Sequence, residues 1–156
     1  MKNKGFTLVE LLAVIVILGI IMVIASSSVS KAVEQSRIRT RFIAAKEIIE
    51  IAAAYIETES DSTSGITSYT YDGNVEFCVN VQKLVEKEYL ESDVTNPKDE
   101  KAKNIIASSD FGNQRVCTLA SSEAQDSEEP QNYVIDPKTG YETVGYKFNG
   151  YVYIFE

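Results

Sequence analysis

The residue that most clearly requires an interaction partner is Glu10. It is the one charged side chain in the 20-residue apolar run from Phe6 to Ala25. A carboxylate in hydrocarbon has no water to solvate it, so Glu10 needs a partner. No comparable signal for catalysis is present, because the sequence lacks histidine, a Gly-rich phosphate loop and a cysteine–histidine pair. We therefore expect no enzyme active site, no cofactor and no metal site.

The run that holds Glu10 is long enough to cross a membrane, since 20 helical residues span about 30 Å. Lys2 and Lys4 precede it and favour a cytoplasmic amino terminus. The sequence thus predicts a transmembrane helix over residues 6–25 behind a basic leader, residues 1–5.

The stretch Gly5-Phe6-Thr7-Leu8-Val9-Glu10-Leu11-Leu12 resembles the class III signal of type IV prepilins and pseudopilins. This resemblance is specific up to about residue 57. It implies that prepilin peptidase cuts after Gly5 and that Phe6 becomes the N-methylated first residue. It also implies that Glu10 meets the Phe6 amine of a neighbouring subunit during assembly. Such pairing is physically sound, because two buried charges that are each costly alone offset one another.

Two simpler interpretations of the amino terminus remain open. Val23-Ile24-Ala25 before Ser26 would suit an ordinary secretory signal, and the apolar run would also suit a plain membrane anchor. Neither explains an acid that lies five residues after a glycine.

For residues 19–30 we expect partial melting of the helix in a filament and a continuous helix in the monomer. The candidates are Gly19, Ser26, Ser27 and Ser28, and Ser27 departs from the helix-kinking proline of many pilins.

The segment 26–57 keeps a helical pattern and carries two apolar stripes. The first is Ile38, Phe42, Ala45, Ile49, Ala53 and Ile56, and the second is Val29, Val33, Ala44, Ile48, Ile51 and Tyr55. A surface helix normally has one stripe. We therefore expect one face to pack on the chain's own sheet and a roughly opposite face to contact neighbouring helices.

Basic residues cluster along the same segment. The cluster consists of Lys31, Arg37, Arg39, Arg41 and Lys46. It could contact anionic headgroups or DNA. Interhelical pairing with Glu34, Glu47 and Glu50 of the same or adjacent subunits is the favoured interpretation. The net charge of −8 argues against general nucleic-acid binding.

Residues 58–156 predict a small globular head. Asp72-Gly73 and Asn149-Gly150 predict tight hairpin turns, and Asn80 predicts a cap for a short helix. Short strands are expected at 105–106, 116–119, 132–135, 141–148 and 151–155. On the last of these strands Tyr151, Tyr153 and Phe155 share one face. One face of the sheet should cover the helix, and the other should carry aromatic rings outward unless a loop shields it. Sheet packing is the favoured interpretation of the aromatic face, and an adhesive or subunit-contact surface is the alternative.

Cys78 and Cys117 are the two cysteines, and an extracytoplasmic head would let them form a disulfide; two buried free thiols are the alternative. The acidic segment 121–130 lacks the alternating spacing of a calcium loop.

The expected fold class is α+β: a long amino-terminal helix, transmembrane in its first half, packed on a small antiparallel sheet as in pilins.

The expected function is that of a structural subunit of a type IV pilus, held in the membrane before assembly and extracellular afterwards. Its expected partners are further copies, other pilins, prepilin peptidase and an inner-membrane assembly platform with an ATPase motor, since the chain has no P-loop of its own. A pseudopilin of a type II secretion or DNA-uptake system is the alternative within the resemblance. A membrane-anchored binding protein that does not assemble is the alternative from another class.

Overall fold

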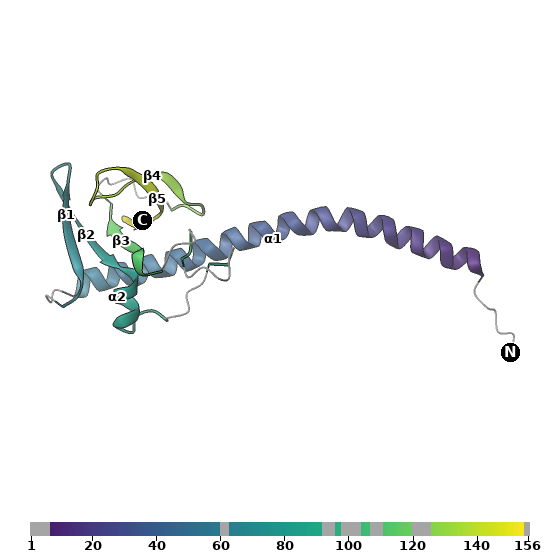
Figure 1. Cartoon of the computed structure of the whole chain (residues 1–156), viewed down its shortest axis with the longest axis horizontal. Helices are drawn as coiled ribbons and strands as arrows, with labels where there is room; N and C mark the ends of the chain where they lie inside the picture. The colour runs from purple at the N-terminus through teal and green to yellow at the C-terminus, as the bar shows by residue number, and fades with distance from the viewer. Residues whose placement is uncertain are drawn as a thin grey trace. The chain divides into compact units, whose positions relative to one another are not determined.

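The structure, a computed structural model, describes residues 7–59, 63–91, 96–97, 104–106, 111–119 and 126–154. It divides into two compact units, Met1–Ser36 and Arg37–Glu156. The elements in chain order (Figure 1) are α1 (Leu8–Thr58), β1 (Ile66–Tyr71), β2 (Asn74–Asn80), α2 (Val81–Glu86), the 3-10 helix η1 (Phe111–Asn113), β3 (Arg115–Thr118), β4 (Gln131–Ile135), β5 (Glu142–Phe148) and β6 (Tyr151–Ile154). This confirms the predicted α+β class with a long apolar first helix.

The six strands form one antiparallel sheet in the order β1-β2-β3-β6-β5-β4. Both predicted hairpin turns are present. Asp72 and Gly73 have φ angles of 47° and 79°, and Asn149 and Gly150 have φ angles of 44° and 85°. Two successive positive φ angles match the right-handed twist of the flanking strands, which is why Asp-Gly and Asn-Gly occur there.

The main core lies between the sheet and the part of α1 that belongs to the second unit. Its buried residues on α1 are Ala45, Ile48, Ile49, Ala52 and Tyr55, with Phe42, Ala44, Ile51 and Ile56 packed against them. Members of both predicted stripes therefore enter the same core. The expectation of two roughly opposite faces is wrong over residues 42–56. At 100° per residue the two stripes lie about 130° apart there and form one wide face.

A second, smaller cluster lies on the other face of the sheet and consists of Cys78, Cys117, Val134, Val152 and Ile154. Along β6 the side chains alternate, so Tyr153 enters the core beside α1 while its neighbours enter the second cluster. The aromatic face of β6 is therefore the one that packs on the helix. The favoured interpretation, packing of this aromatic face, is confirmed for Tyr151 and Tyr153, and the alternative of rings that point outward is wrong for them. Phe155 lies outside the described residues.

Asn80 caps α2 as predicted, since its Oδ1 accepts a hydrogen bond from the Gln82 backbone N–H at 2.8 Å. The strand predicted at 105–106 is absent, and residues 104–106 form a bend. One local and one long-range hydrogen bond replace strand pairing there. The Asn104 side chain accepts from the Ile106 N–H at 3.0 Å, and the Ile105 carbonyl accepts from Arg41 Nε at 3.1 Å.

Candidate functional site

Glu10 lies in the first turn of α1, where its carboxylate has a local partner. The backbone N–H and the hydroxyl of Thr7 both donate to Glu10 Oε2 at 2.9 Å, and the Glu10 N–H faces Thr7 Oγ1 at 3.4 Å. This reciprocal pattern is a capping box, in which a threonine before the helix and a glutamate three residues later satisfy each other's backbone groups. In the single chain, Glu10 is therefore already hydrogen-bonded.

The first part of α1, from Leu8 to Ile24, exposes its apolar side chains. From Leu8 to Ile24 every residue is exposed, and the large apolar side chains range from 48% exposure at Val14 to 81% at Leu8. Among the described residues, α1 is the one helix long and apolar enough to cross a membrane, although a signal sequence would pass the same test of length and composition. Apolar surface of this extent requires lipid or protein around it.

The other predicted residues of this segment are only partly described. Gly5 and Phe6, the predicted cleavage and methylation positions, lie outside the described residues. Gly19 is helical, and a Cβ atom placed there would meet nothing within 4 Å. Residues 26–28 are also within α1. Melting of this segment in a filament stays a prediction, because the structure contains one chain.

Residues 1–26 match the family model of the prokaryotic N-terminal methylation motif. The chain carries the class III prepilin signal. This motif is the signal of type IV pilins, which are structural proteins, and it implies processing by prepilin peptidase. No curated protein and no solved structure is significantly similar to the chain. The matched motif covers residues 1–26 and is common to pilins and pseudopilins.

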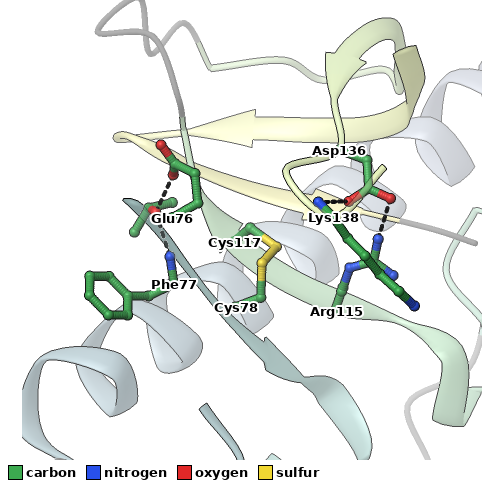
Figure 2. Close-up of a disulfide and its surroundings, with 8 residues drawn as sticks. Glu76, Phe77, Cys78, Arg115, Cys117, Asp136 and Lys138 are labelled. Atoms are coloured by element: carbon green, nitrogen blue, oxygen red, sulfur yellow. Dashed lines mark hydrogen bonds and ion pairs between the residues drawn. A yellow bond between two sulfur atoms is a disulfide. The ribbon is translucent and has the colours of Figure 1, made fainter. Parts of the chain in front are cut away.

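The head that follows the prepilin signal contains the disulfide between Cys78 of β2 and Cys117 of β3. The two residues are direct cross-strand partners, and only 2% and 0% of their surfaces are exposed. Figure 2 shows the bond between two polar contacts. On one side the Thr118 hydroxyl donates to Glu76, and on the other Arg115 contacts Asp136.

The second of these contacts is a buried ion pair. Arg115 begins β3, while Asp136 follows β4 and also accepts from the Lys138 N–H at 2.9 Å. Burial by itself raises the pKa of the Asp136 carboxyl. The hydrogen bonds from Arg115 and Lys138 and the positive charge of Arg115 outweigh that effect and hold the pKa below its ordinary value.

The predicted basic cluster is divided by the fold. Arg41 is buried and donates to the Ile105 carbonyl, and Lys46 Nζ lies 4.5 Å from the centroid of the Phe148 ring. Arg37 and Arg39 remain exposed. The cluster is therefore not one surface. No group of three or more metal-ligating side chains lies together among the residues that the structure describes.

Sequence reasoning missed two features of these sites. The Thr7–Glu10 capping box was readable, because Thr-x-x-Glu directly before an apolar helix is its signature. The Arg115–Asp136 pair had no such signal, since nothing in the spacing of two residues 21 positions apart predicts that β3 and the end of β4 meet.

Proposed function

We propose that the chain is the structural subunit of a type IV pilus. In this proposal the precursor rests in the membrane through α1, is cut after Gly5 and methylated at Phe6, and then polymerises through α1 into an extracellular filament used for adhesion or motility. The observation that carries the proposal is the continuous exposed apolar surface from Leu8 to Ile24, behind a prepilin signal. One copy of the chain offers this surface no cover, whereas lipid or a bundle of neighbouring helices would bury it.

Glu10 would give this assembly its register. Before assembly the Thr7 donors hold its carboxylate. The free amine of a cleaved Phe6 on another copy is a charged donor, and a charged donor forms a stronger hydrogen bond to a carboxylate than a neutral one does. Subunit addition would therefore exchange an internal neutral contact for an intermolecular charged one, in surroundings where an unpaired carboxylate is costly.

The processing step is tested by mass spectrometry of the intact protein isolated from its native cells. We expect a mature chain that begins at Phe6 and carries one additional methyl group. A terminus at Ser26 would identify a secretory signal, and an unmodified chain that begins at Met1 would identify a plain anchor. Either result would overturn the proposal.

The assembly step is tested by Glu10→Gln, which keeps the size of the side chain and removes its charge. Surface fibres should disappear while the amount of membrane-held protein stays the same. Glu142→Gln is the matched control, because Glu142 is an exposed acid in the head. Unchanged fibres after Glu10→Gln would contradict this mechanism. A subunit found in short envelope-spanning rods instead of long surface fibres would identify a pseudopilin, and no polymer at all would identify a non-assembling binding protein.

A further inference from the structure

The part of α1 in the head unit leaves one narrow face uncovered. This face, called the outer stripe, consists of Arg39, Ile43, Glu47, Glu50 and Ala54, all of them exposed. Ile43 is 62% exposed, although residues on either side of it belong to the core. The outer stripe therefore places one large apolar side chain between a cation and two acids.

The charges of the outer stripe have no complement within their own helix. Helical side chains meet at spacings of three and four residues. The neighbours of Arg39 at these spacings are uncharged: Gln35, Ser36, Phe42 and Ile43. Glu47 has Glu50 at one of these spacings, and like charges there are destabilising. Lys46, four residues before Glu50, instead lies over the Phe148 ring.

No ion pair or side-chain hydrogen bond engages Arg39, Glu47 or Glu50 within the described part of the chain. A positive end and a negative end thus lie on one helix face, each without a partner of opposite charge.

We propose that the outer stripe binds the outer stripe of a second copy of this chain, in parallel and shifted by eleven residues. Eleven residues make about three helical turns and rise about 16 Å, so this shift keeps the same faces opposed. It places Arg39 of one copy against Glu50 of the next. The same shift places the large Ile43 side chain against the small Ala54 side chain. Charge and shape therefore select one register together.

An antiparallel arrangement satisfies only half of these conditions. It can also oppose Arg39 and Glu50, but it then sets Ile43 against Lys46 and Glu47, which pairs an apolar side chain with charges. A symmetric antiparallel pair uses the same contacts twice, whereas the shifted parallel contact uses Arg39 and Ile43 of one copy and Glu50 and Ala54 of the other. The inference rests on the proposed filament for its parallel polarity, and it adds the residues and the shift by which neighbouring copies meet.

A charge exchange tests the Arg39–Glu50 contact in cells that assemble the full chain. Arg39→Glu and Glu50→Arg, made separately, place like charges together and should each lower the yield of sheared surface fibres about tenfold or more. The double variant restores opposite charges and should recover most of the wild-type yield. Glu142→Arg changes the net charge by the same amount as Glu50→Arg, so it is the control for that variant and should leave the yield unchanged. Equal yields for the single variants and this control would overturn the proposal.

Cysteine cross-linking tests the register without depending on fibre yield. Two differently tagged copies are co-expressed in the same cells, one with Ile43→Cys and the other with Ala54→Cys, and then oxidised. We expect a 43–54 cross-linked dimer as the main product. A 43–47 product from an Ile43→Cys and Glu47→Cys pair would show the antiparallel arrangement and overturn the proposal, as would the absence of both products.

The two tests separate this inference from the proposed function. One outcome is that fibres require Glu10 but tolerate the charge variants and give no 43–54 product. This outcome would support the filament and refute the contact between outer stripes. Chains that form no fibres but still cross-link between positions 43 and 54 would refute the filament and keep the contact between copies.

Discussion

Arg115 and Asp136 form an ion pair inside the head, with 8% of each side chain exposed. The pair connects β3, at the middle of the sheet, to the segment that follows the edge strand β4. Removing one partner of a buried pair leaves the other charge without compensation, which typically costs about 3–5 kcal/mol. This contact therefore makes the head sensitive both to substitution and to acid.

The acid sensitivity follows from the lowered pKa of Asp136. A carboxyl whose pKa is lower in the folded state stabilises that state above its unfolded pKa, and the stabilisation is lost as the pH falls through the folded pKa. Thermal unfolding of the full chain in detergent should show a decrease in stability below about pH 4. Asp136→Asn should be less stable at pH 7 and should lose part of this acid dependence. Asp126→Asn, at an exposed acid, is the control; an identical pH profile in wild type and Asp136→Asn would contradict the assignment.

The disulfide should contribute strongly to the stability of the head. It closes a sequence interval of 39 residues. On the chain-entropy account such a bond stabilises the folded state by about 4 kcal/mol. The double variant Cys78→Ser, Cys117→Ser should therefore unfold at lower denaturant concentration. Reductant should destabilise the wild type and leave the double variant unaffected. Equal midpoints for the oxidised wild type and the variant would refute this prediction.

Gly145 should tolerate no side chain. A Cβ atom there would lie 2.6 Å from the Tyr153 carbonyl oxygen of β6, which is a backbone atom. Gly145→Ala should therefore force β5 and β6 apart and destabilise the head by about 1–3 kcal/mol. Gly150→Ala is the comparison, because its φ is 85° but no atom lies within 4 Å. Its expected cost is only about 1 kcal/mol, so Gly150→Ala should be the milder of the two in denaturant unfolding.

Thr7→Val should weaken the first turn of α1, because it keeps the shape of the side chain and removes the hydroxyl that bonds to Glu10. Loss of a helix cap costs about 1 kcal/mol. The backbone amide of Glu10, which donates to the Thr7 hydroxyl, and that of Leu11, which donates to the Thr7 carbonyl, should exchange faster with deuterated solvent in detergent micelles. Thr7→Ser keeps a hydroxyl and should exchange like the wild type. Protection that is unchanged in Thr7→Val would show that the capping box adds nothing to this turn.

Much of the local structure was predictable from the sequence, because its causes are local. Asp72-Gly73 and Asn149-Gly150 specify their turns by themselves, and Asn80 caps α2 through a residue two positions away. The first part of α1 was predictable in the same way, because a long apolar run by itself indicates a helix. What depends on topology was not predictable. Period-two alternation shows that Tyr153 and Val152 face opposite sides of β6, but only the fold determines which side meets α1.

The same limit applies to the candidate sites. Pairing of Cys78 with Cys117 could be expected, since the chain has two cysteines and two free thiols were the alternative. Partners for Arg41 could not be assigned, because the Ile105 carbonyl that it contacts lies 64 positions away. The division of the basic cluster follows from that contact and from Phe148, and both are set by long-range packing.

The position of the disulfide has a mechanical consequence. The sheet consists of a β1–β2 hairpin and a meander of β4, β5 and β6, with β3 between them. The ladder between β2 and β3 contains three register pairs, and the disulfide is at one of them. Tension that pulled the hairpin from the rest of the sheet would act on this short ladder. There the load would fall on a covalent bond, so the head would stretch elsewhere before it separated at this junction.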